Sequence, residues 1–378
     1  MMKILYITDS LVIWGGLQRI LVEKMNFLAE QYGYDIYMIT SDQGDHVSPY
    51  PLSPLVHFHD VCIKFHRQYQ YHGFRRILVM RKLQILYEKR LKSCIDEINP
   101  DVLVCVRIHL LKSLLRVKGQ IPLVVESHSM CKAYLYDEDN TLRRLKARYE
   151  AYRVRKAQRV VALTQGDADD WKKINRNVCI IPNIVHLNES GEVSECSAKK
   201  AIYVGRFSKQ KDIDTLIKIW TQVHLRHPDW QLCIYGGYSD QYDRFMRLLD
   251  NNNINIEVNE PTSSIFQRYI DSSMLLLTSL YEPFGLVLPE AMSCGLPVVS
   301  FDCPYGPADI ISDGVDGFLI PDRDISLFTD KVCMLIEDSS LRKAMGKAGT
   351  LSSQRFSANR IMPGWKCFFD QIVENSNS

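Results

Sequence analysis

The sequence lacks any apolar run long enough to span a lipid bilayer, which takes roughly 18 to 20 residues. Its first apolar stretch, residues 1–8, ends at Asp9, which is too early for the core of a signal peptide. The eleven cysteines include no CxxC pair, so neither a disulfide framework nor a zinc site is predicted. We therefore expect a soluble, cytoplasmic protein with reduced thiols.

The composition also lacks the biases of disordered, collagenous and low-complexity chains. Hydrophobic residues make up 46% of the 378 residues and charged residues 24%, with 19 glycines and 15 prolines. Because a domain contains roughly 150 residues, this length predicts two or three domains.

Charge is divided unevenly along the chain, although the formal net charge is only +2. Residues 1–184 contain 28 Lys and Arg against 19 Asp and Glu, a net charge of +9. The remaining residues contain 18 against 25, a net charge of −7. A basic half of this kind favours an anionic surface or ligand as its partner.

Short apolar runs alternate with segments of helical period throughout the chain. In the first half, the predicted strands are 3–8, 35–39, 56–61, 102–106, 123–125, 160–163 and 179–181. In the second half, they are 201–204, 231–235, 254–258, 274–277, 297–301 and 317–320. This alternation predicts an α/β fold of two doubly wound, Rossmann-like domains, each with a parallel sheet covered on both faces.

A polar stretch without apolar period separates the two series of strands. We expect one domain at 1–184 and another at 201–356, joined by a linker at 185–200. The last helical segment and its polar tail, 357–378, are expected to pack back toward the first domain.

Two segments of the first half are strongly basic. Residues 64–92 contain nine Lys and Arg and one acid, Glu88, with interleaved apolar and aromatic residues, a mixture that suits an anionic membrane surface. Residues 143–159 contain eight Lys and Arg against Glu150, which we interpret as a solvated helix face. No stacking or groove-reading module is present, so a nucleic-acid partner is not expected.

Ligands of open parallel sheets bind beyond the carboxyl ends of the strands, so each loop that follows a strand is a candidate site. Gly15 and Gly16 follow the first strand, where the absence of a Cβ lets backbone N–H groups approach a phosphate. A tight turn explains the pair equally well, because the full GxGxxG fingerprint is absent. After strand 201–204, Arg206 and Lys211 flank a helix start, an arrangement that binds diphosphate, the alternative being a solvated turn.

The strongest signal is a pair of carboxylates, Glu282 after a buried strand and Glu290 within the next helix. Carboxylates accept hydrogen bonds from the hydroxyls of ribose and hexose. The backbone N–H groups of Phe284, Gly285 and Leu286 lie at the helix start, which favours a phosphate. The pair therefore indicates a sugar nucleotide, the alternative being a helix cap and an exposed helical carboxylate.

The seven residues between Glu282 and Glu290, with the glycine pair after the first strand, resemble the retaining glycosyltransferases of family four. Arg206 and Lys211, which precede the carboxylates, match the same family. The resemblance spans nearly the whole chain and implies the GT-B fold, in which two Rossmann-like domains face each other across a cleft. It implies that the first domain binds the acceptor and the second binds the nucleotide sugar.

The resemblance also implies roles for the candidate residues. Arg206 and Lys211 would bind the donor diphosphate and stabilise the leaving group. Glu290 would bind the ribose hydroxyls, and Glu282 would lie near the hydroxyls of the transferred sugar. Gly16 would approach the phosphate from the opposite domain.

Two further positions match the family. His128 follows strand 123–125 and matches a histidine beside the transferred sugar, although a lone histidine is otherwise often structural. Gly236 matches the glycine turn near the nucleotide base. The sequence departs from the family pattern at Gln18, where many members have Glu, and at Cys303, which begins a replacement of a frequent glycine pair.

No Asp-x-Asp motif lies in a setting that suggests a bound metal, so we expect metal-independent transfer without a cofactor other than the donor. The expected donor is a UDP- or GDP-linked sugar. The expected acceptor is a glycan or a polyprenyl-linked sugar in bacterial surface-polysaccharide synthesis, reached from the inner membrane face. Two other functions stay open: a sugar-nucleotide epimerase on the same scaffold, and a non-catalytic, membrane-associated scaffold.

Overall fold

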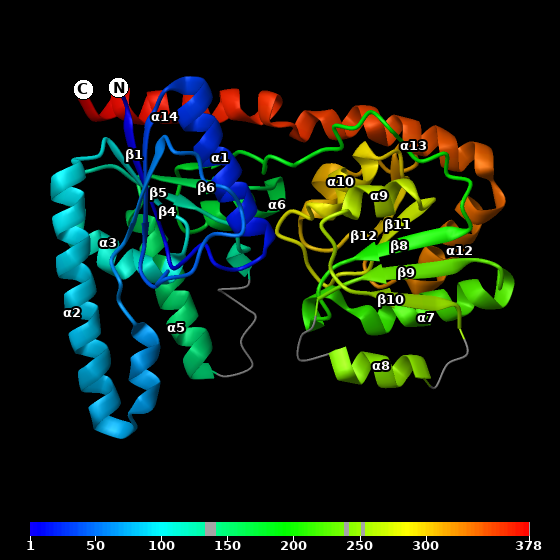
Figure 1. Cartoon of the computed structure of the whole chain (residues 1–378), viewed down its shortest axis with the longest axis horizontal. Helices are drawn as coiled ribbons and strands as arrows, with labels where there is room; N and C mark the ends of the chain where they lie inside the picture. Colours follow the sequence, from blue (N-terminus) through cyan, green and yellow to red (C-terminus); the bar gives the residue numbers. More distant parts are fainter. Residues whose placement is uncertain (133–140, 238–241, 251–253, 378) are drawn as a thin grey trace. The chain divides into compact units, whose positions relative to one another are not determined.

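The computed structural model of the chain describes residues 1–132, 141–237, 242–250 and 254–377 (Figure 1). By its internal contacts the chain divides into two compact units, Met1–Ile184 with Ile361–Ser378, and Val185–Arg360.

The first unit is built on a parallel sheet with the strand order β3-β2-β1-β4-β5-β6-β7. Its strands are β1 (Lys3–Thr8), β2 (Asp35–Thr40), β3 (Val56–Asp60), β4 (Val102–Cys105), β5 (Leu123–Glu126), β6 (Arg159–Ala162) and β7 (Val178–Ile180). Its helices are α1 (Gly16–Tyr32), α2 (Gly73–Ile98), α3 (Leu111–Val117), α5 (Thr141–Tyr152), α6 (Gln165–Lys172) and, from Ile361 on, α14 (Ala358–Asn377). Short 3-10 turns are η1 (Phe65–Gln70), η2 (Ile108–Leu110) and η3 (Arg153–Lys156).

Strand β1 lies at the centre of this sheet because its apolar run suits burial on both faces. Ile4 pairs with Ile36 of β2 on one side and with Val102 of β4 on the other. All three side chains are buried. Helix α1 adds an apolar face that includes Ile20 and Leu28.

The second unit repeats this plan with the parallel strand order β10-β9-β8-β11-β12-β13. Its strands are β8 (Lys200–Val204), β9 (Gln231–Tyr235), β10 (Ile256–Asn259), β11 (Met274–Leu277), β12 (Val298–Phe301) and β13 (Gly317–Ile320). Its helices are α7 (Ile213–Arg226), α8 (Tyr242–Asp250), α9 (Ile265–Ile270), α10 (Val287–Ser293), α11 (Gly306–Ile310), α12 (Ile325–Glu337) and α13 (Ser339–Ser353), with turns η4 (Lys209–Lys211) and η5 (Gln354–Phe356).

The α/β fold class predicted from the alternating pattern is confirmed. Every predicted strand is present, and each begins and ends within two residues of its predicted bounds. Parallel strands buried on both faces read as continuous apolar runs, which is why the pattern located them.

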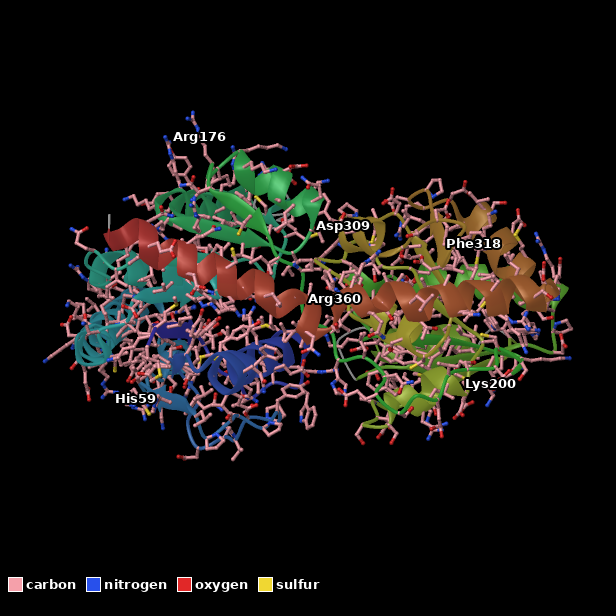
Figure 2. All side chains as sticks on the ribbon, turned by 90° about the horizontal axis from the view of Figure 1, so that it is seen from above. His59, Arg176, Lys200, Asp309, Phe318 and Arg360 are labelled. Carbon is pink, nitrogen blue, oxygen red and sulfur yellow. The ribbon has the colours of Figure 1, made fainter. Side chains whose placement is uncertain are left out.

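The segment 185–200, which we expected to be a linker, belongs to the second unit. There the backbone N–H of Ser194 donates to the carbonyl of Cys294 at 2.8 Å. Helix α14 begins in the second unit and continues in the first; Arg360, labelled in Figure 2, is the last residue of the second unit. Further along this helix, Asp370 accepts a hydrogen bond from the Tyr34 hydroxyl at 2.8 Å.

Each sheet has a central strand at which the strand order changes direction. In the second unit, β8 lies between β9 and β11, so the loops after β8 and β11 are neighbours at the carboxyl edge. In the first unit, β1 lies between β2 and β4 in the same way. Open parallel sheets bind their ligands at such points. In the described part of the chain, no helix is both long enough and apolar enough to cross a bilayer.

Candidate active site

In the loop after β8, an exposed cation, Arg206, is followed by a buried aromatic residue, Phe207. Phe207 is fully buried and packs against Tyr242 and Phe245 of α8. Arg206, the residue before Phe207, is exposed. Among the described residues, its guanidinium has no ion-pair partner. Arg206 is therefore available to an anionic ligand at the carboxyl edge of the sheet.

Lys211 and Glu282 form an ion pair between the ammonium Nζ and the carboxylate Oε1. Both side chains are largely buried, with exposed fractions of 16% and 6%. The Ser279 hydroxyl donates to the same carboxylate oxygen at 2.6 Å. Two residues that the sequence places 71 positions apart are thus brought together where the loops after β8 and β11 meet.

Backbone contacts hold these two loops together. The N–H of Leu280 donates to the carbonyl of Gln210 at 2.7 Å, and the Gln210 side-chain amide donates to the carbonyl of Tyr281 at 2.9 Å. The position of Lys211 relative to Glu282 therefore does not depend on their ion pair alone.

Arg323, which follows β13, binds both loops with one guanidinium. It donates to the Asp212 carboxylate at 2.7 Å, to the Thr278 carbonyl at 3.1 Å and to the Ser279 carbonyl at 2.5 Å. Its guanidinium also lies 4.2 Å from the centre of the Phe301 ring. A planar group with five donors in a fixed geometry can join three acceptors in this way, which lysine cannot.

The turn from β11 into α10 depends on glycine. Gly285 has a φ of +96°, which side-chain-bearing residues rarely adopt. Gly306, at the start of α11, lies so close to this turn that a Cβ there would be 1.7 Å from the Phe284 carbonyl oxygen. Among the described residues, the backbone N–H groups of Phe284, Gly285 and Leu286 have no hydrogen-bond acceptor. They are free to bind an anion.

Glu290 is 7% exposed, in spite of its charge, and lies on α10. Its Oε2 accepts a hydrogen bond from the hydroxyl of Tyr269, a buried residue of α9, at 3.3 Å. The alternative of an exposed helical carboxylate is therefore wrong for Glu290. A buried carboxylate held by a donor is suited to orienting a ligand hydroxyl.

Gly236 lies in tight contact with the loop that carries Arg206. A Cβ at this position would be 2.5 Å from the carbonyl oxygen of Gly205 and 2.5 Å from a ring carbon of Phe207. The glycine is required by this close approach, which places the end of β9 directly against the loop after β8.

The other predicted residues belong to the first unit. Gly15 is the N-cap of α1 and Gly16 its first residue, so the glycine pair forms the expected transition from strand to helix. Gly15 has an extended backbone that any residue can adopt, so its conformation alone does not demand glycine.

His128 follows β5 and is linked to two buried charges. Its Nε2 lies 2.9 Å from Oε1 of Glu126, and the same oxygen is bonded to the Lys24 ammonium. The Lys24 and Glu126 side chains are each 1% exposed. The ammonium lies 5.1 Å from the centre of the Tyr6 ring and 4.1 Å from that of Trp365 on α14. His128 is therefore the outer member of a buried lysine–carboxylate–histidine chain.

Burial and charge act in opposite directions on this chain. Burial favours the neutral form of Glu126, but the charge of Lys24 and the hydrogen bonds from His128 and Lys24 outweigh it and lower the pKa of Glu126 to about 2. Burial lowers the pKa of Lys24, and Glu126 opposes this shift. Burial also lowers the pKa of His128. Glu126 is thus ionised and His128 neutral at physiological pH.

Lys24 and Glu126 were not found by our sequence reasoning, although one signal for them exists. Lys24 lies between Ile20 and Leu28 at intervals of four residues, so it interrupts the apolar face of α1. A lysine on an apolar helix face requires a buried partner. Only the fold shows that this partner is Glu126, 102 positions away.

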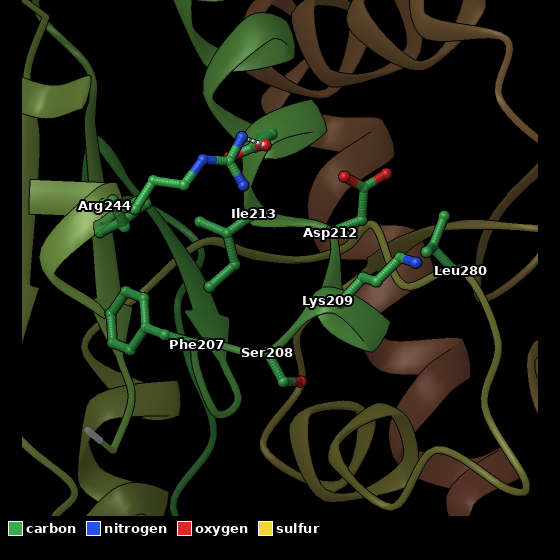
Figure 3. A pocket seen from close by; sticks show the side chains of 9 residues that line it. Phe207, Ser208, Lys209, Asp212, Ile213, Arg244 and Leu280 are labelled. Carbon is green, nitrogen blue, oxygen red and sulfur yellow. Dashed lines mark hydrogen bonds and ion pairs between the residues drawn. The ribbon is translucent and has the colours of Figure 1, made fainter. Parts of the chain in front are cut away.

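A cavity of about 330 Å³ lies beside the β8–α7 loop (Figure 3). Its lining residues are Phe207, Ser208, Lys209, Asp212, Ile213, Asp214, Arg244, Phe245 and Leu280. Two of these lining residues, Arg244 and Asp214, form an ion pair. None of the predicted site residues lines this cavity, so the candidate site lies outside it. In the described ranges, no group of three or more His, Cys, Asp or Glu is arranged to hold a metal ion.

Two family models match the chain one after the other. Residues 14–189 match the model described as Glycosyltransferase Family 4, and residues 191–352 match Glycosyl transferases group 1. The chain belongs to the family-four glycosyltransferases. The boundary between the two matches, at residue 190, lies close to the boundary between the two units after Ile184.

Known proteins resemble this glycosyltransferase along its whole length. It is 25% identical over 374 residues to the amylovoran biosynthesis glycosyltransferase AmsD of Erwinia amylovora, a match that covers 97% of this chain and 99% of AmsD. A crystal structure of S. aureus TarM in complex with fondaparinux, alpha-GlcNAc-glycerol and UDP gives a TM-score of 0.78 at 15% identity, covering 98% of this chain and all of that one. Sucrose-phosphate synthase from Thermosynechococcus elongatus gives 0.82 at 18% identity, covering 99% and 100%. The predicted family and the GT-B fold are confirmed.

Proposed function

We propose that this glycosyltransferase transfers a sugar, with retention of anomeric configuration, from a UDP- or GDP-linked donor to a glycan or polyprenyl-linked acceptor in cell-surface polysaccharide synthesis. The observation that carries the proposal is the meeting of Lys211 and Glu282 at the carboxyl edge of the second sheet. The name of AmsD, an amylovoran biosynthesis glycosyltransferase, and the UDP in the TarM complex support the acceptor and donor classes.

Donor binding would replace the ion pair that the free site contains. The diphosphate would take the Lys211 ammonium and the exposed Arg206 guanidinium, together with the N–H groups of Phe284, Gly285 and Leu286. Glu282 would then be free to accept hydrogen bonds from hydroxyls of the transferred sugar. Neither partner would be left with an unpaired buried charge, which would be costly.

The remaining contacts would fix the ends of the donor. Glu290, oriented by Tyr269, would accept hydrogen bonds from the ribose hydroxyls, and the turn at Gly236 would lie against the base. From the first unit, we propose that Gly16 approaches the phosphate and that His128 lies beside the transferred sugar.

In the proposed reaction, the bond between the anomeric carbon and the diphosphate oxygen breaks as the sugar develops oxocarbenium character. The acceptor hydroxyl attacks the same face of the sugar, and its proton passes to the leaving phosphate. Arg206 and Lys211 stabilise the negative charge that grows on this phosphate, a preorganised electrostatic contribution that is commonly the largest in catalysis. Because these cations carry the charge, the proposal requires no metal, and chelation by EDTA should leave the rate unchanged.

A panel of sugar nucleotides incubated with membrane extract tests this function. Transfer predicts that nucleoside diphosphate is released only when acceptor is present. Isomerisation of the donor would instead indicate an epimerase, and binding without turnover would indicate a scaffold.

Substitutions test the site assignment within the same assay. Lys211→Ala should lower turnover about 100-fold or more, because it removes a charge aimed at the leaving group. Lys209→Ala is the matched control, since Lys209 is an exposed lysine of the same turn. Glu290→Ala should weaken UDP binding about tenfold or more through the loss of a buried acceptor. Equal rates in the two lysine variants would contradict the assignment.

We also propose that α2 and η1 contact an anionic membrane surface. Apolar and aromatic side chains that would be buried in most helices are exposed here: Tyr69, Tyr71, Phe74, Ile77, Leu78, Met80, Ile85 and Leu86. All nine Lys and Arg of residues 64–92 are exposed as well. Apolar side chains that enter the headgroup region, combined with cations that meet anionic lipids, account for both sets.

Vesicle co-sedimentation tests this surface. The double variant Phe74→Glu/Ile77→Glu should bind mixed phosphatidylglycerol and phosphatidylcholine vesicles about tenfold or more weaker than wild type. The control Leu225→Glu/Leu351→Glu changes two exposed leucines of the second unit. Identical binding by both double variants would refute the membrane contact without affecting the proposed reaction.

A further inference from the structure

The first unit contains a strongly basic pocket that the candidate active site does not use. Its volume is about 660 Å³. Residues of α3, α5 and η3 line it, namely Lys112, Leu115, Arg116, Tyr149, Tyr152, Arg153, Arg155 and Lys156. The sequence suggested only a solvated helix face for residues 143–159. The fold instead brings that segment together with two cations of α3.

The pocket gathers positive charge without a matching number of acids. Five of its eight lining residues are cationic, and no acidic residue lines it among the described residues. Glu88 of α2 pairs with Arg116 at 2.9 Å, and Glu150 lies 3.9 Å from Lys146, which is outside the pocket. The other four lining cations have no ion-pair partner within the described ranges. Like charges held together repel one another, and a bound anion would relieve this repulsion.

Two of the guanidinium groups are held in place by the tyrosines. Arg153 lies 4.4 Å from the centre of the Tyr149 ring. Arg155 lies 5.7 Å from the centre of the Tyr152 ring and donates to its hydroxyl at 2.6 Å. Stacking of Arg153 on the Tyr149 ring leaves the N–H edge of its guanidinium open, and this edge matches two oxygens of a phosphate. Fixed guanidinium groups also lose less conformational entropy when a ligand binds.

We infer that this pocket binds a phosphate-bearing group, a diphosphate or a phosphodiester. The site is distinct from the proposed donor site, because none of the residues assigned to the donor site, in either unit, lines this pocket. The same chemistry is presented by a phospholipid headgroup and by the phosphate of a soluble or acceptor-borne ligand. The experiment distinguishes these sources.

Inorganic pyrophosphate and vesicles of phosphatidylglycerol with phosphatidylcholine are the two probes, used with the full chain. Pyrophosphate is titrated by calorimetry with UDP present in excess, so that a functional donor site is already filled. The test variant is Arg153→Gln/Arg155→Gln. The control is Lys172→Gln/Lys173→Gln, which removes the same charge from two exposed lysines, the last residue of α6 and its C-cap, in the same unit.

The test variant should lose about tenfold or more of the affinity for pyrophosphate, for vesicles or for both, while the control stays within about twofold of wild type. Loss of pyrophosphate binding identifies a phosphate site accessible to soluble ligands, and loss of vesicle binding alone identifies a lipid headgroup site. Wild-type binding should weaken as salt rises. Because the readout is binding and not turnover, the result does not depend on the proposed reaction.

The inference is overturned if the two double variants bind both probes equally, or if wild type binds neither. It is also overturned if a single-stranded RNA binds the same residues more tightly than either phosphate probe, since stacking bases on the tyrosines would then explain the pocket.

Discussion

Lys24 shows how a single buried charge sets the state of a neighbouring residue. Its ammonium offsets the charge of Glu126, so the pair presents no net charge to His128. A neutral imidazole that donates from Nε2 to Glu126 keeps Nδ1 as an acceptor. A cationic imidazole would instead oppose the positive charge that develops on a sugar during transfer.

Lys24→Met should raise the pKa of His128, so that a larger fraction of the imidazole is protonated at a given pH. Glu126 raises this pKa, whereas Lys24 and Arg107 lower it, and the Tyr6 hydroxyl beside the pair is uncharged. Removing Lys24 therefore leaves the attraction of Glu126 for the protonated ring less opposed. Nuclear magnetic resonance titration of labelled histidines measures the shift, and the acid limb of the transfer rate should move upward with it.

The double variant Lys24→Met/Glu126→Gln guards against a loss of folding, because it removes both buried charges and keeps an acceptor for the His128 N–H. It should restore the low pKa of His128. Lys172→Met is the control for loss of an exposed lysine. A His128 titration that is the same in Lys24→Met and in wild type would contradict this account.

At the level of elements, the candidate site is a junction of loops. The charged residues of the site lie in the segments that follow β8 and β11. Arg323, which follows β13, donates hydrogen bonds to both segments. The sequence predicted that each loop after a strand is a candidate site. The strand order of the structure shows that the loops after β8 and β11 are neighbours. The role of Arg323 could not be predicted, since its partner Asp212 lies 111 positions away.

Arg323→Met should lower UDP affinity and turnover about tenfold to 100-fold, although we place Arg323 outside contact with the donor. The loops after β8 and β11 would lose the hydrogen-bond donor that they share. Small displacements of catalytic groups lower the reaction rate strongly. Arg323→Lys should recover only part of the loss, because an ammonium cannot reproduce the planar fork. UDP calorimetry and steady-state kinetics measure both effects.

Arg226→Met is the matched control, since Arg226 is an arginine of the same unit that pairs with Asp330 at 2.8 Å at the surface. If Arg323→Met binds UDP and turns over donor as this control does, the two loops are positioned without Arg323.

At the level of the whole molecule, helix α14 belongs to both units. Its residues up to Arg360 are part of the second unit, and from Ile361 it completes the first. Trp365 is 2% exposed, and its ring stacks with Phe369 at 5.5 Å. The first unit is thus completed by a segment that follows the second unit in the sequence.

Trp365→Ala should destabilise the first unit by about 3 to 5 kcal/mol, the usual cost of removing a buried tryptophan side chain. The second unit should be unaffected, so unfolding by denaturant should separate into two transitions. UDP should raise the denaturant midpoint of only the second unit's transition, which occurs at the higher denaturant concentration. Trp14→Ala, at a residue that is 74% exposed in the first unit, should change stability by less than about 0.5 kcal/mol. A single transition that Trp365→Ala shifts as a whole would show that the units unfold together.

The amino-acid sequence was enough to predict the two parallel sheets and the segments that carry Arg206, Lys211, Glu282 and Glu290. Burial on both faces of a strand, and the positions of strand ends, are recorded in local composition and spacing. The partners of these residues and the assembly of the basic pocket depend on packing between segments that are distant in the sequence. Lys24 with Glu126, Arg323 with Asp212, and the cations of α3 with those of η3 meet through packing, because a local pattern does not specify contacts between distant segments.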